Sequence, residues 1–362
     1  MQILISMKVC TSSLKAIDFF CGGGGMTYGL RQSGIDVIAG VDFAEECKDT
    51  YEQNNPTSTF INSDIRELKE NYFEENFSIK RNDDNLIFVG CSPCQYYSII
   101  NTDRKKSKDT KDLLREFMRF VDYYNPGYIL VENVPGILTR TDSVFPLFED
   151  FLKKKKYFYK YEIVNMCYYG VPQTRKRFSL IASRLGDVYM PKPDKTKAVL
   201  SEFIGLENGF PSIEAGHKDV TDFMHTASSL APINIKRLIN TPLNGGSRLA
   251  WKDNPALQLR CYIGKDHSFT DVYGRLRWDK PSSTITTNFV KITSGRFAHP
   301  IENRGLSIRE GATLQTFPKD YKFCANSILA NARIIGNAVP PEYARRLGIL
   351  LYELKEKYNG TI

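Results

Sequence analysis

Between residues 14 and 183 the sequence alternates short apolar runs with longer stretches whose apolar residues recur at helical spacing. This pattern is typical of an α/β protein whose strands form a doubly wound, mostly parallel sheet. The predicted strands are residues 15–20, 37–42, 58–61, 86–90, 128–132, 161–166 and 178–182. The predicted helices between them are residues 26–33, 44–53, 112–124 and 144–154.

The alternation stops after residue 184, and Pro, Gly, Asn and Thr become frequent up to about residue 281. This composition predicts a smaller, less regular module. Beyond it, residues 307–316 and 341–358 again have helical periodicity, and the second helix carries an apolar stripe that needs a core. The stripe consists of Leu347, Leu350, Leu351 and Leu354. Because the first sheet is the simplest partner for this helix, we expect one domain from residues 1–185 and 300–362, with residues 186–299 inserted as a second domain.

Charge and cysteine content narrow the class of protein. The chain has 49 Lys and Arg residues against 41 Asp and Glu residues, and its net charge of +8 suits a polyanionic partner without requiring one. Its eight cysteines are scattered through 362 residues, which favours reduced thiols in the cytoplasm. The segment MQILISMKVC has no leading basic residues and is too short for a signal sequence or a membrane span, so we expect no membrane association.

A glycine-rich turn follows the first predicted strand. The segment AIDFFCGGGGMTYGL runs from a strand through this turn into a helix, an arrangement that brings a nucleotide cofactor against bare backbone. A dinucleotide fingerprint needs glycines at relative positions one, three and six, but the sixth residue from Gly22 or Gly23 is Thr27 or Tyr28. The turn therefore fits a cofactor without phosphates better than a dinucleotide.

Acidic residues follow the next two predicted strands. Asp42, about 20 residues after the turn, can accept hydrogen bonds from both hydroxyls of a ribose, and the adjacent Phe43 can stack on an adenine. Asp64, in NSDI, is placed to receive the adenine amino group. Either aspartate alone could be a helix cap. Their occurrence in series at successive strand ends favours a cofactor site.

The fourth predicted strand leads to two cysteines. In LIFVGCSPCQYYS a Pro-Cys-Gln step exposes the Cys94 thiol at the carboxyl edge of the sheet, where ligands bind in such folds. Cys91 and Cys94 also form a Cys-x-x-Cys pair, which leaves a redox pair as an alternative. A structural zinc site would need a second ligand pair, and the four histidines, at 217, 225, 267 and 299, offer none at suitable spacing, so we expect no metal.

The motifs DFFCGGGG, GVD, NSD, PCQ, ENV, QTRKR, REGATLQTFP and GNAVPP occur in this order. In kind and order they resemble the motifs of the cytosine-5 DNA methyltransferase family, in its bacterial form with a single target-recognition region. The resemblance covers residues 15–183 and 284–350. It implies the fold of S-adenosylmethionine-dependent methyltransferases, methyl transfer to carbon 5 of a flipped-out cytosine in double-stranded DNA, and a role in restriction-modification.

The resemblance also implies the catalytic set Cys94, Gln95, Glu132, Asn133, Arg175 and Arg177. A cysteine thiolate that adds to carbon 6 turns the cytosine ring into an enamine, which can attack a methyl sulfonium. Glu132 would protonate or hydrogen bond ring nitrogen 3, and Asn133 would help to hold the loop. Arg175 and Arg177 alternate along an expected edge strand, so both can face the crevice. By resemblance Arg177 contacts the 2-oxo group and Arg175 lies near the thiol, where a cation favours the thiolate.

The cofactor implied by the resemblance is S-adenosylmethionine, with S-adenosylhomocysteine as product. The motifs place beside it Asp18, Phe20, Gly22, Gly24, Asp42, Phe43, Asp64, Ile65, Pro93, Asn337 and Ala338.

Two basic segments are candidates for DNA contact. The polar loop after Cys94 carries Arg104, Lys105 and Lys106, which we interpret as phosphate contacts on a loop that closes over DNA. Residues 236–280 contain nine basic and four acidic residues with five interleaved aromatic residues, so base-edge readout is expected there. The candidate DNA contacts in this segment are Arg248, Arg260 and Arg275.

Other functions stay open from the sequence. An RNA cytosine-5 methyltransferase acting on tRNA would share the catalytic motifs, although the long basic insertion favours duplex DNA. A catalytically silent DNA-binding protein would not require Cys94, Glu132 and Arg177 together. An NAD-linked oxidoreductase is weakened by the glycine spacing. We expect a monomer that binds double-stranded DNA, with a cognate restriction endonuclease acting separately.

Overall fold

The computed structural model describes residues 13–93 and 112–360. Seven strands form one sheet in the order β3-β2-β1-β4-β5-β7-β6. β1 to β5 pair in parallel, whereas β7 runs antiparallel between β5 and β6. The predicted doubly wound, mostly parallel sheet is therefore confirmed. The strands are β1 (Lys15–Phe19), β2 (Asp36–Asp42), β3 (Thr59–Asn62), β4 (Leu86–Gly90), β5 (Tyr128–Asn133), β6 (Phe158–Asn165) and β7 (Lys176–Ser183).

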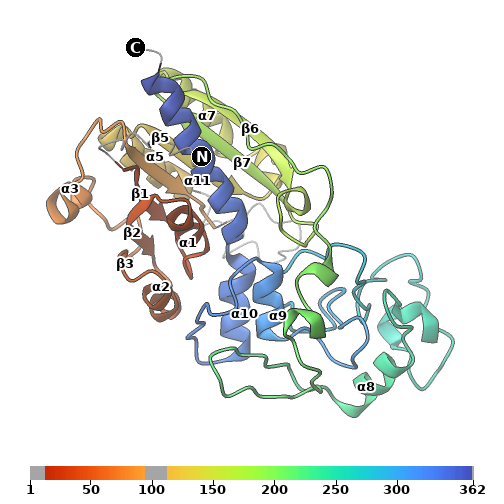
Figure 1. The fold of residues 1–362 in the computed structure, drawn as a ribbon. Helices are drawn as coiled ribbons and strands as arrows, with labels where there is room; N and C mark the ends of the chain where they lie inside the picture. The colour runs from red at the N-terminus through yellow and green to blue at the C-terminus, as the bar shows by residue number, and fades with distance from the viewer. Residues whose placement is uncertain (1–12, 94–111, 361–362) are drawn as a thin grey trace, which may run out of the picture.

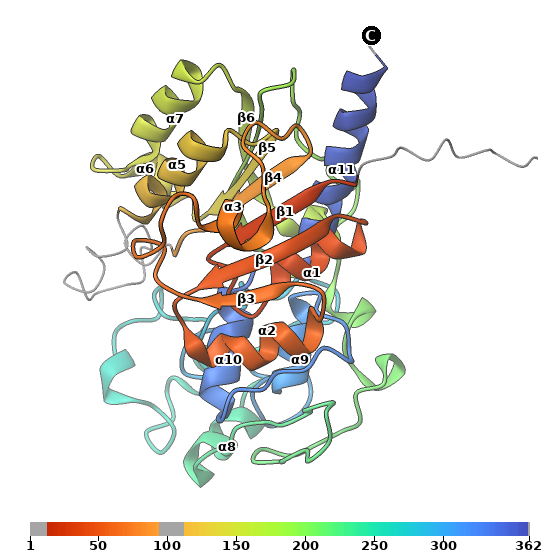
Figure 2. The same cartoon turned by 90° about the vertical axis from the view of Figure 1, so that its left-hand side faces the viewer.

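Helices cover both faces of the sheet (Figure 1, Figure 2). Alternate side chains of a strand point to opposite faces, and the core divides accordingly. Ile17 belongs to a cluster with the helices on one face, and the adjacent Ala16 belongs to a cluster with the helices on the other. The first face is covered by α3 (Tyr72–Phe77), α5 (Leu113–Tyr124) and α7 (Phe145–Lys154), and the second by α1 (Gly25–Gln32) and α11 (Pro341–Asn359). Two further helices are α2 (Lys48–Asn54) and the short α6 (Gly136–Thr139).

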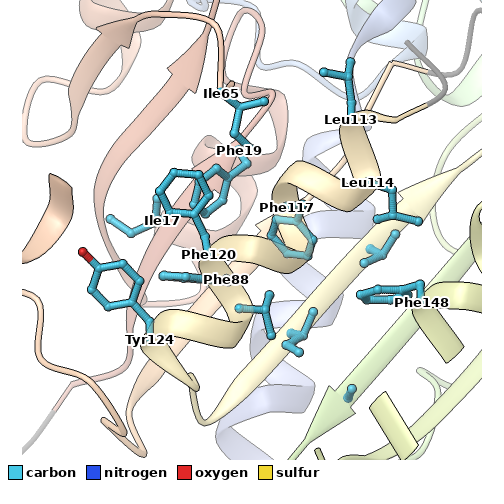
Figure 3. Packing of buried hydrophobic residues seen from close by; sticks show 14 of the residues in the cluster. Ile17, Phe19, Ile65, Phe88, Leu113, Leu114, Phe117, Phe120, Tyr124 and Phe148 are labelled. Atoms are coloured by element: carbon cyan, nitrogen blue, oxygen red, sulfur yellow. The ribbon is translucent and has the colours of Figure 1, made fainter. Parts of the chain in front are cut away.

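Aromatic rings dominate the first face. Phe19 from β1 makes edge contacts with Phe88 from β4 and Phe117 from α5, at centroid distances of 5.2 and 5.4 Å. Figure 3 shows these rings between the sheet and α5. This packing fixes β1 and β4 side by side, and the functional turns follow these two strands.

The tail returns to the sheet as predicted. Leu347, Leu350, Leu351 and Leu354 of α11 are buried against the second face. The close approach of α11 to α1 depends on Gly29, because a Cβ there would lie 2.2 Å from the Pro341 carbonyl oxygen.

The remaining elements form a smaller lobe below the sheet in Figure 1. Its helices are α8 (Pro232–Ile239), α9 (Ile308–Leu314) and α10 (Ile328–Asn337), and the other segments are loops and short 3₁₀ turns. These turns are η3 (Leu200–Glu202), η4 (Leu206–Asn208), η5 (Arg248–Trp251) and η6 (Arg260–Tyr262), whereas η1 (Glu45–Cys47) and η2 (Met166–Tyr168) flank the sheet. The structure contains α10, which the sequence pattern did not predict.

A third core cluster joins the two parts of the molecule. In it, residues of α9 and α10 pack with Leu200 and Phe289 of the smaller lobe and also with Tyr51 and Phe60 of the sheet domain. Within the predicted tail segment, α11 packs on the sheet and α9 and α10 contact both parts, so the boundary at residue 300 stays a prediction. Within residues 13–93 and 112–360, no helix is long and apolar enough to span a membrane.

Candidate active site

The functional turns meet at one edge of the sheet because parallel strands end on the same side. The strand order reverses between β1 and β4, and ligands bind at such switch points in open α/β sheets. β7 runs the opposite way and pairs Ser179 with Glu132 and Phe178 with Asn133, so its first residues also lie at this edge.

The glycine-rich turn begins at the end of β1. Gly22 has φ of 51°, which favours glycine, and a Cβ built on it would meet nothing within 4 Å. Open space therefore faces bare backbone at the position predicted to receive a cofactor. Gly24 instead serves packing, because a Cβ there would lie 2.5 Å from Asn55 Nδ2. Phe20 also has a positive φ, of 64°.

Asp42, at the end of β2, stabilises this turn by hydrogen bonds. Its carboxylate accepts hydrogen bonds from the backbone N–H groups of Gly22, at 2.8 Å, and Ala44, at 2.9 Å. Burial raises the pKa of Asp42, and these hydrogen bonds oppose the increase. A carboxylate offers about four lone pairs, so acceptor capacity remains for a ligand's hydroxyls. The neighbouring Phe43 side chain is 68% exposed, an available ring beside the turn.

Asp18 lies beneath the turn and does not line it. The residue is fully buried, and one carboxyl oxygen accepts a 2.7 Å hydrogen bond from the Thr27 hydroxyl. The other oxygen has no hydrogen-bond partner among the described residues. Burial raises the pKa of Asp18 to about 7. Its placement supports the start of α1, which differs from the direct cofactor contact expected from the motif.

The other predicted cofactor residues differ in burial and in how close they lie to the turn. Asp64 is half-buried and accepts a 2.9 Å hydrogen bond from Arg66 Nε, which lowers its pKa. Ile65 is buried in the core on the first face, so its side chain does not line the crevice. A Cβ on Gly25 would lie 3.3 Å from the Ala338 side chain, which places the end of α10 against the glycine-rich turn. Asn337 beside it is exposed, and Pro93 is half-buried after β4.

Glu132 and Arg177 form an ion pair across β5 and β7. Arg177 Nε lies 3.1 Å from Glu132 Oε1, without the geometry of a hydrogen bond. Glu132 is buried, and burial raises the pKa of its carboxyl group, although Arg177 and then Arg175 oppose the increase. A carboxyl group in this setting can be protonated at a pH where an exposed glutamate is ionised.

Asn133 connects this pair to the segment that leads to Cys94. Its side-chain amide donates to the Ser92 carbonyl oxygen at 3.2 Å and to the Ser92 hydroxyl at 3.3 Å. Cys94 and Gln95 themselves, with Arg104, Lys105 and Lys106, lie outside the described residues. Cys91 is half-buried against the second face, and burial raises the pKa of its thiol.

The structure gives Arg175 and Arg177 different hydrogen-bond and ion-pair partners. The edge strand of the sheet is β6, not β7, and Arg175 lies one residue before β7 begins. The prediction that both arginines lie on an edge strand is therefore wrong. Arg175 is buried and donates to the backbone carbonyl oxygens of Ile285 and Ala338, both at 3.1 Å. It therefore ties the sheet domain to the smaller lobe.

Two glutamines that the sequence did not single out complete this joint. Gln315 donates to the Ile335 carbonyl oxygen at 2.6 Å, and Gln173 donates to Gln315 Oε1 at 2.7 Å. The Gln173 side chain also accepts a hydrogen bond from the Ile285 N–H. Their partners are distant in sequence, so no local pattern indicates this role.

In the smaller lobe, two predicted DNA contacts are corrected. Arg248 and Arg275 are fully buried. Arg275 donates to backbone carbonyl oxygens including those of Thr241 and His299, and Arg248 donates to carbonyls of its own lobe. Both guanidinium groups hold loops together because irregular segments leave carbonyl oxygens that helices and strands would otherwise satisfy.

Of the remaining basic and aromatic residues of segment 236–280, some are buried and others are exposed. Trp251 and Tyr273 are core residues of the smaller lobe. Arg260 is exposed, as predicted for a surface contact, and Phe269 is 62% exposed. The predicted excess of basic residues is thus partly internal, and a smaller set of side chains reaches the surface.

Comparisons with known proteins show the family to which the chain belongs. The family described as C-5 cytosine-specific DNA methylase matches residues 14–352. The chain is 36% identical over 335 residues to the type II methylase M.HgiDII of Herpetosiphon aurantiacus, covering 91% of this chain and 92% of the relative. It is 29% identical to the type II methyltransferase M1.BsuMI of Bacillus subtilis, covering 94% and 81% of the two chains.

Solved structures share the fold. A prophage-encoded protein of Escherichia coli superposes with a TM-score of 0.71 at 20% identity, over 95% of this chain and all of that chain. DNMT2 of Spodoptera frugiperda superposes with a TM-score of 0.62 at 19% identity, over 94% of this chain and all of that chain. Since the family match spans nearly the whole sequence, the chain belongs to the C-5 cytosine-specific DNA methylase family.

Proposed function

We propose that the chain transfers a methyl group from S-adenosylmethionine to carbon 5 of a cytosine within a specific double-stranded DNA sequence, through a transient bond between Cys94 and the base. The observation that carries this proposal is the buried Glu132–Arg177 pair, which Asn133 links to the segment entering Cys94. We further propose that the chain acts as a monomer and protects DNA from a separate restriction endonuclease.

The role of Cys94 follows from the weak nucleophilicity of carbon 5. The thiolate adds to carbon 6, the double bond between carbons 5 and 6 opens, and the resulting enamine is nucleophilic at carbon 5. Once carbon 5 carries the methyl group, loss of its proton and departure of the Cys94 thiolate restore the aromatic ring. The methyl group stays on the base and the cysteine is regenerated.

Glu132 is suited to activate the ring. Addition at carbon 6 places negative charge on nitrogen 3, and a protonated carboxyl group there can donate to it. Burial raises the pKa of Glu132, which favours the form that donates. Arg177, 3.1 Å from the same carboxyl, can contact the 2-oxo group of the ring. The pair would thus hold one edge of the cytosine by two adjacent contacts.

The residues around the glycine-rich turn fit S-adenosylmethionine. Gly22 leaves open space against backbone, Asp42 keeps acceptor capacity for ribose hydroxyls, and Phe43 exposes a ring for an adenine. When bound, this cofactor supplies an electrophilic methyl group. Asp64 and Ala338 would flank the same ligand from β3 and from the end of α10.

Access to a cytosine inside a duplex requires base flipping, which costs a few kcal/mol. Duplex DNA is favoured over RNA as substrate because the matching family is that of C-5 cytosine-specific DNA methylases and similar relatives are type II methylases. The test is bisulfite sequencing of plasmid DNA from cells that express the chain or its Glu132→Ala variant. The proposal predicts methylated cytosines within one recurring sequence for the wild type alone.

A parallel assay separates the two nucleic acids. Purified enzyme receives labelled S-adenosylmethionine with either duplex DNA or tRNA. Label in DNA supports the proposal, whereas label confined to tRNA would assign the chain to RNA.

A further inference from the structure

A loop of the smaller lobe, residues 260–270, is built around the buried Arg248. Its guanidinium group donates to three carbonyl oxygens of this loop, those of Lys265 at 2.5 Å, Ser268 at 2.8 Å and Phe269 at 3.1 Å. The Tyr262 ring packs over the same group, with its centroid 4.6 Å from the guanidinium carbon. Among the described residues no carboxylate pairs with Arg248, so the loop encloses a positive charge balanced only by carbonyl dipoles and one aromatic face.

This clamp sets the direction of the loop's backbone donors. In a trans peptide the C=O and the N–H point in opposite directions. Because the carbonyls of residues 265, 268 and 269 point at Arg248, the N–H groups of Asp266, Phe269 and Thr270 point away from it. Within the described part of the chain, none of these three N–H groups donates to another residue. The outer side of the loop therefore carries donors over a fixed positive charge, which favours a partner rich in acceptors.

The loop also exposes two apolar side chains. Ile263 is 65% exposed and Phe269 is 62% exposed, whereas Trp251 and Tyr273 of the same lobe are core residues. Phe269 has φ of 54°, a backbone conformation that costs free energy for a residue with a side chain. These two apolar side chains on a clamped loop are available for contact with a partner.

Charge and position identify the partner class. Arg260 and Lys265 are exposed on this loop without an ion pair to a described residue, and the Lys265 ammonium lies 5.9 Å from the centre of the Phe269 ring. The carboxylate of Asp266 in the loop is paired with Lys252. Figure 2 shows the cyan loops of the smaller lobe on the same side of the molecule as the carboxyl ends of β1 and β4. A polyanion that reaches the active-site edge can therefore touch this loop at the same time.

We propose that residues 260–270 form a base-reading loop, in which Ile263 and Phe269 contact apolar base edges such as the methyl group of thymine in the major groove. The major groove presents this methyl group beside acceptors that outward N–H groups can meet. Arg260 and Lys265 contact phosphates and carry no sequence preference. The inference rests on the proposed action on duplex DNA and adds which side chains choose the sequence.

The test compares sequence preference in Ile263→Ala and Phe269→Ala with that of the wild type. Each protein, with S-adenosylhomocysteine present, selects from a library of randomised duplexes, and the enriched sequences are determined. Val220→Ala is the matched control, because Val220 is a 97% exposed aliphatic residue of the same lobe outside the loop. Thermal unfolding and cofactor binding confirm that each variant is folded.

For at least one loop variant we expect the preference at one or more base pairs to fall by about tenfold to a hundredfold, the range for a specific base contact. Lys265→Gln should instead weaken binding to all sequences equally and reduce its salt dependence. If both alanine variants keep the wild-type preference as Val220→Ala does, or if the wild type selects no sequence, the inference is overturned. Because selection needs no methyl transfer, an inactive enzyme that still selects a sequence through this loop would count against the proposed function alone.

Discussion

Arg177 and Glu132 meet at the sheet edge, with the arginine Nε 3.1 Å from the glutamate Oε1. They come from antiparallel strands separated by more than 40 residues, and their adjacency depends on the pairing of Ser179 with Glu132. This pairing places a buried acid and a cation together at the edge where Cys94 follows β4.

Replacement of Glu132 by Gln should lower kcat/KM by about 10²–10⁴-fold, the usual contribution of a general acid or base. In the wild type, activity should decline as the pH rises through the pKa of Glu132, which burial raises, because the protonated carboxyl is the form that donates to the ring. Steady-state rates across pH measure both effects.

The control for this prediction is Glu162→Gln. Glu162 occupies the same rung of the sheet on β6 but is exposed, and its replacement should leave the rate and its pH profile unchanged. Wild-type activity in Glu132→Gln would show that catalysis does not require this carboxyl group.

Asp42→Ala should weaken binding of S-adenosylmethionine by about tenfold to a hundredfold, because hydrogen bonds to a charged group each contribute roughly 1.5–3 kcal/mol. The substitution removes the acceptor of the Gly22 and Ala44 N–H groups as well as the acceptor predicted for ribose. Isothermal titration measures the Kd. Asp49→Ala, on the exposed side of α2, is the control. Equal affinities of the two variants for S-adenosylmethionine would contradict the proposed role of Asp42 in cofactor binding.

Arg175→Ala should destabilise the protein by about 3 kcal/mol or more, because it removes the charged donor to carbonyl oxygens of Ile285, Gly336 and Ala338 in the smaller lobe. The loss concerns Ile285 and Ala338, and Ala338 lies against the glycine-rich turn. We therefore expect a lower midpoint of chemical unfolding together with a raised KM for the cofactor. Arg184→Ala, at the other end of β7, should lower stability less, since Arg184 is half-buried. An unchanged unfolding midpoint in Arg175→Ala would show that Arg175 does not stabilise the contact between the sheet domain and the smaller lobe.

His299 makes the smaller lobe sensitive to acid. Its Nδ1 accepts a 3.0 Å hydrogen bond from the Glu302 N–H, which requires an unprotonated nitrogen, and burial lowers the pKa of the ring to about 4. Glu310, Arg304 and Glu302 face the same ring. Since the unfolded chain takes up this proton near pH 6.5 and the folded chain does so only near pH 4, stability should fall as the pH decreases through this window, by on the order of 3 kcal/mol.

Chemical unfolding at pH 7.5 and pH 4.5 tests this loss of stability. In His299→Gln, which keeps a side-chain acceptor without a titrating ring, the difference between the two pH values should shrink. An equal difference in both proteins would show that another group controls the acid sensitivity.

The central strands were predictable because they are short apolar runs, whereas β6 is mostly exposed. Asp42 and Glu132 could be located because they lie at the ends of such runs. α10 was missed although Ser327 caps it by accepting a hydrogen bond from Ala330 N–H, a start signal that is visible in the sequence. Its apolar residues pack between the sheet domain and the smaller lobe, partners that local periodicity does not reveal.

The sequence does not indicate which arginines are buried and which are exposed. Arg248, Arg260 and Arg275 look equivalent in a basic segment, yet only Arg260 is exposed. Arg275 is buried because loop carbonyls converge on it from residues as distant as His299, and such convergence depends on tertiary folding. Similarly, Arg175 is buried against the Ile285 and Ala338 carbonyl oxygens whereas Arg177 pairs with Glu132, and these distant partners are not encoded in local periodicity.

The most direct test of the covalent mechanism uses duplex DNA with 5-fluorocytosine at the target position, mixed with enzyme and S-adenosylmethionine. Fluorine cannot leave as the proton does, so the adduct should persist, and mass spectrometry should place it on Cys94. Cys91→Ser should still form the adduct and Cys94→Ser should not. An active wild-type enzyme that forms no adduct, or one that forms it through another residue, would contradict the proposed mechanism.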